Sequence, residues 1–597
     1  MSTHTYSLNW DLDVFFKGGS DSEDFHKHLS NLAQKLEHFE KHVSDWDIPK
    51  NENDVAAFSQ LLKDFQEAAQ MQRQAGAFVS CLQAQNTNDL EANALRGKVT
   101  NYGAKLQTIL TTFDKKLVDI LDEQWAALLQ HPEMKELQFI LNERRTQAKE
   151  KLSKEQEALI QVLSVDGYHG WGEMYDTLVS QIKVPFEEDG HLKELSVGQA
   201  HNKFSDADPL VRKTIFSNWQ SAWNAHADSF ASTLNHLAGF RLAVYKERGW
   251  DSVLKEALSY NRMQQKTLDV MWEVITDYKQ HFVAYLERKA KMLGKEKLSF
   301  YDVSAPIGST EKKYTYQEGA AFIMEHFSAF GNKLAAFTKQ AFEDRWIEAE
   351  DRSGKRPGGF CTSFPMSGQS RIFMTYSGSP SNVSTLAHEL GHAFHSYALR
   401  DVHPLNRNYA MNVAETASTF AEMIVADASV KNASSEEEKL TLLEDKINRS
   451  ATFFMNIYAR FLFETRFYEE RKDGIVSKDR LNALMMEAQK EAYGDALEEY
   501  DPLFWASKLH FFITSVPFYN FPYTFGYLFS LGIYAKALQT GKDYEEKYIA
   551  LLQDTGSMTV EELAKKHLDV DLTKRDFWEQ GVKLCVDDVK AFLSMTE

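Results

Sequence analysis

Two histidines and a glutamate stand close enough in the sequence to hold and use one metal ion. The stretch reads His388-Glu389-Leu390-Gly391-His392. Residues four apart in a helix share one face, so both imidazoles can bind a single ion. The glutamate beside them can then reach a water molecule on that ion, as in zinc-dependent peptidases. These five residues therefore predict metal-assisted hydrolysis.

The segment around these residues has the pattern of an amphipathic helix. We expect Ser381 or Asn382 to cap its start, just after a Gly-Ser-Pro break. The two histidines lie roughly opposite the apolar stripe, so packing in a core does not explain them; two half-buried histidines on such a helix are the plain alternative. The stripe itself recurs at helical spacing and consists of Leu386, Leu390, Ala393, Phe394 and Tyr397.

A second polar segment downstream offers a third ligand. A catalytic zinc ion usually has three protein ligands and one open position. We predict Glu415 as the third ligand; a solvated helix glutamate is the alternative. Glu422, two turns further on, is predicted to accept the free N–H of a ligand imidazole. His395 lies one turn beyond His392, and we expect it beside the site rather than on the metal.

An uncharged aromatic run covers residues 511–534. Its length matches a membrane span, but prolines, tyrosines, an asparagine and glycines interrupt it, so we predict a buried cleft wall instead. The polar members of this region are His510, Tyr519, Tyr523 and Tyr527. Imidazole and phenol groups can donate to the oxyanion that forms when water attacks a peptide carbonyl. The alternative is that the three tyrosines form one packed helix face.

These segments together resemble a known family. Residues 385–396, 415–422, His510 and 518–526 are similar in order and spacing to the oligoendopeptidase F branch of the thimet-oligopeptidase-like zinc peptidases. The stretch Asn-Trp-Asp-Leu-Asp at residues 9–13 also resembles the beginning of those chains. The likeness extends over most of the second half and more faintly over the first.

The resemblance implies a mainly α fold, a multi-helical ellipsoid with a deep central channel, that cleaves short unstructured peptides. It implies one zinc ion per chain, bound by His388, His392 and Glu415, with Glu389 as the general base. By the same likeness, His510 and Tyr519 are transition-state donors. A further donor is implied at Tyr523 or Tyr527.

The amino-acid composition indicates the broad class of protein. The chain has 597 residues, 43% hydrophobic and 26% charged, which is ordinary for a soluble globular protein. The net charge of −19 argues against nucleic acid as a partner. Cys81, Cys361 and Cys585 are too scattered for a disulfide framework, and the N-terminal residues lack the pattern of a secretory signal. We therefore expect a cytoplasmic protein without a membrane partner; the oligomeric state is left open.

We expect two domains with a soft boundary near residue 190. Residues 1–190 read as amphipathic helices and are predicted to form one wall of the channel, and residues 182–195 look like a hairpin or linker. Residues 191–597 are the predicted catalytic domain. Within it, residues 359–364 and 371–376 predict a small antiparallel sheet next to the metal-binding helix. The sheet edge can pair with an extended peptide or can simply brace the helix.

Taken together, the sequence predicts a zinc-dependent oligoendopeptidase that hydrolyses internal bonds of short peptides. Two alternatives stay open. One is a peptide-binding helical protein without catalysis. The other is a zinc amidohydrolase that acts on small amides.

Overall fold

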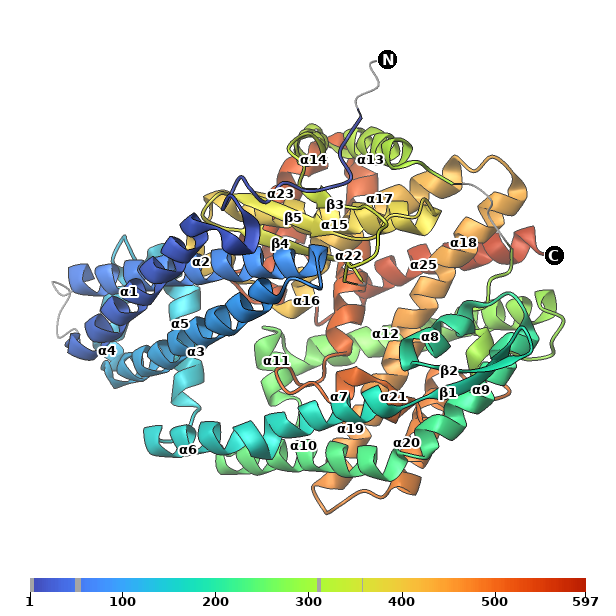
Figure 1. Cartoon of the computed structure of the whole chain (residues 1–597), viewed down its shortest axis with the longest axis horizontal. Helices are drawn as coiled ribbons and strands as arrows, with labels where there is room; N and C mark the ends of the chain where they lie inside the picture. Colours follow the sequence, from blue (N-terminus) through green and yellow to red (C-terminus); the bar gives the residue numbers. More distant parts are fainter. Residues whose placement is uncertain (1–4, 49–54, 309–312, 357) are drawn as a thin grey trace.

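Helices make up most of the structure, and two small sheets complete it (Figure 1). The structure is a computed structural model, and it describes residues 5–48, 55–308, 313–356 and 358–597. The predicted mainly α architecture is confirmed. The expected central channel stays a prediction.

The N-terminal part is a bundle of long helices, blue to cyan in Figure 1. Side-chain caps start two of them: Ser22 accepts the N–H of Phe25, and Asp89 accepts that of Ala92. The helices up to residue 149 form two cores that are separate from the core of the later helices, and one of the two also includes Phe364 and Phe373 of the second sheet. The last of the N-terminal helices contributes Tyr175 to the larger core instead. The elements are α1 (Glu23–Asp45), α2 (Val55–Gln85), α3 (Leu90–Asp119), α4 (Asp122–Gln130), α5 (Gln138–Lys149), α6 (Lys154–Ser164) and α7 (Gly170–Gln181).

A β-hairpin follows these helices. Strands β1 (Val184–Glu188) and β2 (His191–Leu195) pair antiparallel along their whole length. Between them, Asp189 and Gly190 have φ angles of 54° and 75°. Positive φ at both central residues is the geometry of a type I′ turn, which an Asp-Gly pair favours. The predicted hairpin near residue 190 is confirmed.

The remaining helices build the larger core. It spans buried residues from Tyr168 to Phe592. The helices before the metal-binding segment are α8 (Val197–Asn202), α9 (Pro209–Asn224), α10 (Ala227–Glu247), α11 (Lys255–Tyr260), α12 (Gln265–Met292), α13 (Tyr316–Phe330) and α14 (Asn332–Glu343). Those after it are α18 (Glu436–Ala451), α19 (Ile457–Arg471), α20 (Lys478–Ala492), α21 (Phe504–Ser507), α22 (Phe521–Thr540), α23 (Glu545–Asp554), α24 (Val560–Leu568) and α25 (Arg575–Met595).

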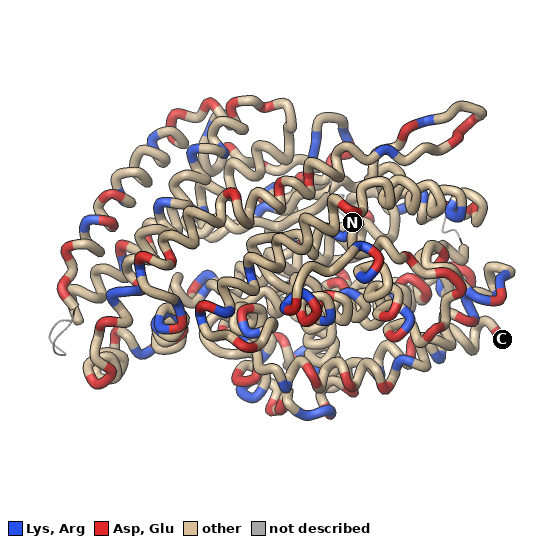
Figure 2. The backbone as a smooth tube through the Cα atoms, turned by 90° about the horizontal axis from the view of Figure 1, so that it is seen from below, with Lys and Arg blue, Asp and Glu red and all other residues tan. Residues whose placement is uncertain are grey.

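Charged residues are spread along these helices. Figure 2 shows acidic and basic positions interleaved, so that individual helices carry both signs. The net charge of −19 is therefore distributed over the chain and not gathered on one element.

The second sheet has three strands in the order β3-β5-β4. Strands β4 (Phe360–Phe364) and β5 (Gln369–Phe373) pair antiparallel, as predicted. Strand β3 (Ile347–Glu348) pairs parallel with β5 on its other side, so the sheet is mixed and not purely antiparallel. A two-residue strand is too short to show the alternation that marks strands in a sequence. Strand β4 is left at the edge of the sheet.

The predicted metal-binding segment forms α15 (Pro380–Ala398), but its cap is Ser379 and not Ser381 or Asn382. The Ser379 hydroxyl accepts the N–H of Asn382 at 3.2 Å, and the Asn382 side chain accepts the N–H of Ser379. Pro380 occupies the first helical position, where its missing N–H costs nothing. The reciprocal cap therefore starts the helix earlier than predicted.

The uncharged run lies largely in α22. That helix packs against α17 (Thr416–Lys431), α25 and α16 (Met411–Ala414), and within residues 521–534 all side chains except Tyr523 are buried. This arrangement agrees with a buried wall. Throughout the described ranges, every helix is too short or too polar to meet the criteria for a membrane span.

The most extensive contact between two helices joins α15 to α17 (Thr416–Lys431). Gly391 allows it, because a Cβ at that position would lie 2.4 Å from the Ala417 carbonyl oxygen and 2.6 Å from the Ser418 Cα. Both atoms belong to the backbone of α17 and cannot rotate away. Glycine is therefore needed for this contact and not for helix propensity.

We predict that Gly391→Ala destabilises the fold by about 1–3 kcal/mol, because the added methyl group forces two helix backbones apart. Urea unfolding followed by circular dichroism measures the loss. The matched control is Gly97→Ala in α3, where a Cβ meets no atom within 4 Å. Alanine there should stabilise the helix by about 0.5–1 kcal/mol. Equal effects at the two positions would contradict the packing argument.

Candidate metal centre

One helix and one helix junction bring the three predicted metal ligands together. His388 and His392 lie on one face of α15, and Glu415 lies where α16 ends and α17 begins. One ligand atom from each residue lies within 4.8 Å of the other two. Glu415 Oε2 is 3.3 Å from His388 Nε2 and 3.5 Å from His392 Nε2. Ligands at 2.0–2.1 Å around a tetrahedral zinc ion stand about 3.3 Å apart, so this donor set fits zinc.

The carboxylate of Glu415 is held in place from its own helix. The Ser418 hydroxyl donates to Glu415 Oε2 at 2.9 Å. Glu415 also precedes the first turn of α17, where free N–H groups favour a negative charge. Burial raises the pKa of Glu415, but the hydrogen bond to His388 and the charges of both imidazoles outweigh it and lower the pKa to about 2. The group is therefore an anion.

The two imidazoles have opposite tendencies to carry a proton. Burial lowers the pKa of His388, but hydrogen bonds to Glu415 and Glu422 raise it to about 10. Burial dominates at His392 and lowers its pKa to about 4. Positive charge is thus favoured beside the Glu415 carboxylate, where the Nε2 atoms of both imidazoles lie. A divalent ion placed there satisfies the same field.

Glu389 lies beside this point and is 7% exposed. Its Oε2 has no hydrogen-bond partner among the described residues, which is unusual for a buried carboxylate. Burial raises its pKa to about 7, against the opposing charge of His388. Gly359, just before β4, faces its other oxygen, and a Cβ there would stand 3.5 Å from Oε1. The carboxyl group can therefore both accept and release a proton near neutral pH.

Glu422 supports the centre from the far side of His388. Its Oε2 is 3.3 Å from His388 Nδ1, the position predicted from the sequence. Arg449 of α18 contacts the other oxygen, Oε1. Burial raises the pKa of Glu422, and the charge of Arg449 lowers it below its usual value. Arg449 was not predicted, because nothing in the sequence of α18 links it to Glu422 on the preceding helix, α17.

His510, Tyr519 and Tyr523 form a second group of candidate residues. Their ring centroids are 5.6 Å apart for His510 and Tyr519, 6.2 Å for His510 and Tyr523, and 5.7 Å for the two tyrosines. Burial and the charges of Arg460 and Lys508 lower the pKa of His510 to about 4. Burial and the neighbouring Tyr519 raise the pKa of Tyr523. The imidazole is therefore neutral and Tyr523 keeps its phenolic proton.

This group adjoins the metal ligands because α22 packs tightly on α16. A Cβ at Gly526 would lie 2.9 Å from the Asn412 carbonyl oxygen and 3.2 Å from Glu415 Cβ. Tyr523 precedes Gly526 by one turn, and the charge of Glu415 contributes to its raised pKa. Phe518, next to Tyr519, has a left-handed φ of 52°, a strain that clusters at functional sites. Gly526 and Phe518 were not predicted as parts of the site.

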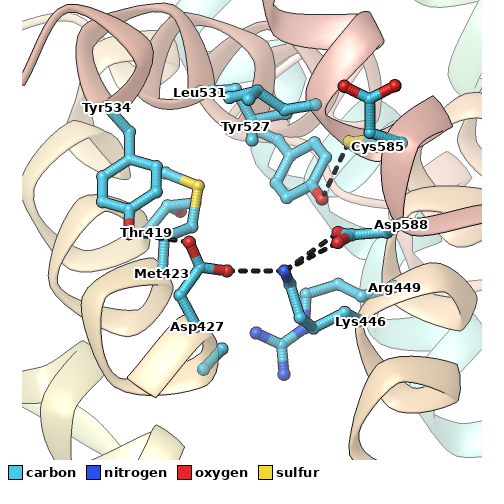
Figure 3. Close-up of a pocket in the computed structure, with 13 residues that line it drawn as sticks. Thr419, Met423, Asp427, Lys446, Arg449, Tyr527, Leu531, Tyr534, Cys585 and Asp588 are labelled. Carbon is cyan, nitrogen blue, oxygen red and sulfur yellow. Dashed lines mark hydrogen bonds and ion pairs between the residues drawn. The ribbon is translucent and has the colours of Figure 1, made fainter. Parts of the chain in front are cut away.

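Tyr527 lies elsewhere. Its hydroxyl is 2.8 Å from Ser450 Oγ and 3.6 Å from Cys585 Sγ. Figure 3 shows it lining a different pocket, in which Lys446 pairs with Asp427 and Asp588. One helical turn separates Tyr527 from Tyr523, yet its hydroxyl is already engaged in the core.

His395 belongs to α15 and is fully buried. Its Nε2 is 2.9 Å from Thr555 Oγ1, and its ring stacks on Tyr409 with centroids 4.2 Å apart. Burial lowers its pKa to about 3, so it is neutral. It braces α15 and does not belong to the set of converging ligand atoms.

Comparison with known families gives two matches. The model described as "Peptidase family M3" matches residues 204–584, and the one described as "Oligopeptidase F" matches residues 116–183. The first match contains every ligand and donor candidate described above.

Individual relatives agree with these families. An oligoendopeptidase F homologue of Lactococcus lactis subsp. lactis is 23% identical over 583 residues, which cover 95% of this chain and 94% of the relative. A chromosomal oligoendopeptidase F of Lactococcus lactis subsp. cremoris is 27% identical over 423 residues, covering 69% and 68%. The solved oligoendopeptidase F of Enterococcus faecium has a TM-score of 0.71 at 19% identity, over 96% of this chain and 99% of that one. The last comparison shows a shared fold.

We predict that Glu422→Gln weakens binding of a divalent ion about 10–100-fold, because the amide no longer supports His388 with a full charge. Competition against a chromophoric chelator measures the affinity. Glu437→Gln, an exposed position on neighbouring α18, is the matched control and should leave the affinity unchanged. Equal affinities for the two variants would show that Glu422 does not support the ligand.

Proposed function

The chain belongs to peptidase family M3, the metallo-oligopeptidases, and from that premise we propose that it is a zinc-dependent oligoendopeptidase of short, unstructured peptides. One observation carries the proposal. Two imidazoles and a carboxylate converge within ligand distance of one another, beside a buried glutamate whose second oxygen lacks a partner. We assign one zinc ion to His388, His392 and Glu415.

Each residue of the site has a step in the proposed reaction. His388, His392 and Glu415 would hold a zinc ion, which would supply a Lewis acid for the scissile carbonyl and would lower the pKa of a water molecule to about 7. Glu389, with its own pKa near neutrality, takes a proton from the attacking water and passes it to the leaving amine. Burial around the site strengthens these charge interactions.

The developing oxyanion needs hydrogen-bond donors. We assign this role to Tyr519 and Tyr523, with His510 beside them as a neutral donor. Tyr523 keeps its proton because burial and Tyr519 raise its pKa, so it donates and does not compete as an anion. Tyr527 is not assigned, because its hydroxyl is engaged by Ser450.

The edge of the three-stranded sheet supports the proposed substrate class. Strand β4 is an edge strand and packs against α15, so an extended peptide can add to it beside the predicted metal ligands. Such pairing uses the peptide backbone and favours substrates longer than a single amide, in contrast to a small-amide hydrolase. The relatives' names, oligopeptidase and oligoendopeptidase, support the same class. Membership of a peptidase family displaces the alternative of a peptide-binding protein without catalysis.

We propose the division near residue 190 as two functional parts. The two family matches end at 183 and begin at 204, on either side of it. We keep the cytoplasm as the proposed compartment, since Cys81, Cys361 and Cys585 carry free thiols.

We predict that Glu389→Gln lowers turnover of an internally quenched peptide by at least about 10²–10⁴-fold, because no group remains to accept the proton from water. Zinc content by elemental analysis should stay at the wild-type level. His388→Ala should lose both zinc and cleavage, and a chelator should abolish cleavage by the wild type. A Glu389→Gln enzyme that still cleaves at the normal rate would remove the general-base assignment.

We predict that Tyr519→Phe and Tyr523→Phe each lower kcat about 10²–10³-fold with little change in KM, because one oxyanion donor is lost. Steady-state kinetics on a decapeptide provides the measurement. Tyr527→Phe is the matched control on the same helix as Tyr523 and should keep kcat near normal. The reverse pattern, with only Tyr527→Phe impaired, would overturn the choice of donors.

A further inference from the structure

Two histidines and an aspartate also meet far from the candidate metal centre. His38 and His42 lie four residues apart on α1, and Asp64 faces them from α2. One ligand atom from each lies within 4.8 Å of the other two. Figure 1 shows α1 and α2 side by side at the end of the molecule away from α15. The spacing of the imidazoles is that of His388 and His392.

The carboxylate of Asp64 is built into this place. It is 2% exposed, although a buried carboxylate is costly without partners. Gln60, one turn earlier on α2, donates to Oδ1 at 3.3 Å. The other oxygen, Oδ2, faces both imidazoles. The carboxylate is thus oriented by a neighbour that leaves one oxygen directed at α1, as supporting residues do around metal ligands.

Both imidazoles approach that single oxygen. His42 Nδ1 hydrogen-bonds to Oδ2 at 2.6 Å, and His38 Nε2 lies 3.4 Å from it without a hydrogen bond. A simple His–Asp pair needs only one imidazole. The separation of 3.4 Å is close to the distance of about 3.3 Å between two ligands of a tetrahedral zinc ion. Binding of an ion requires His42 Nδ1 to move from 2.6 Å to about 3.3 Å from Oδ2.

The surroundings suit a metal ion with one side open to solvent. Phe39 and Phe65, which follow His38 and Asp64 in the sequence, are buried and stack with centroids 6.1 Å apart. His38, whose side chain is 64% exposed, closes the outer side. Two imidazoles and one carboxylate select a divalent transition-metal ion, because magnesium and calcium prefer oxygen ligands throughout.

We propose that His38, His42 and Asp64 form a second zinc-class site, which cross-links α1 to α2. This site is independent of catalysis and goes beyond the proposed function. Binding to the folded state alone stabilises that state by mass action. The bound ion therefore stabilises the packing of α1 against α2.

Metal stoichiometry in zinc-buffered dialysis tests the proposal. Wild type should hold a second zinc ion beyond the catalytic one. His38→Ala and Asp64→Asn should each lose that ion while keeping full cleavage of a quenched peptide. His26→Ala, an exposed histidine on the same helix, is the matched control and should retain it. Wild type with no second ion, or His38→Ala and Asp64→Asn chains that retain it, would overturn the proposal.

A second measurement separates this site from the catalytic one. In a His388→Ala background, zinc should raise the urea midpoint of unfolding, and adding His42→Ala should remove that shift. Cobalt bound to the His388→Ala chain should give visible absorption bands that His42→Ala abolishes. If the catalytic ligands bind no zinc while these signals persist, the proposed function fails and the second site stands. If the signals are absent and the wild type still cleaves peptides with zinc, the second site fails alone.

Discussion

The close approach of α15 to α17 is the constraint on which the candidate active site depends. Gly391 has no side chain, so the backbone of α17 lies where a Cβ would stand. The contact carries Glu415 to within 3.3 and 3.5 Å of two imidazoles on the neighbouring helix. A wider separation would leave three good ligands that share no common point. Gly526 allows a similarly close contact between α22 and α16, and this contact brings Tyr523 towards Glu415.

Burial then converts this arrangement into chemistry. Water strongly weakens the interaction between two charges, and the same charges interact much more strongly when they are buried together. Glu415 and Glu422 remain anions because His388 and Arg449 offset the cost of burying them. At Glu389 the charge of His388 does not outweigh burial, and the pKa rises to about 7. The same helix face therefore holds a charged ligand environment and a carboxyl group poised to exchange protons.

Local patterns predicted much of this, and their limits are physical. Three predicted features depend on neighbours in the sequence, and each is present. They are the shared helix face of His388 and His392, the hairpin near residue 190, and the two antiparallel strands of the second sheet. Ser379 was missed as the cap because Ser381 and Asn382 are equally good capping types, and only the reciprocal bond to Asn382 distinguishes them. Strand β3 was missed because two residues carry no alternation. The tyrosines at positions 519, 523 and 527 look equivalent in the sequence, yet Ser450 engages only the last.

The sequence by itself determined which side chains share a helix face, because helical and strand periodicity are properties of neighbouring residues. The sequence was therefore enough to predict that His388 and His392 share a helix face, that Glu389 lies next to them, and that the fold is mainly α. Only the tertiary structure decided that Arg449 supports Glu422, that Tyr527 points into a different pocket, and that Asp64 faces His38 and His42. Those contacts join residues from different helices, and the packing of whole helix surfaces selects them.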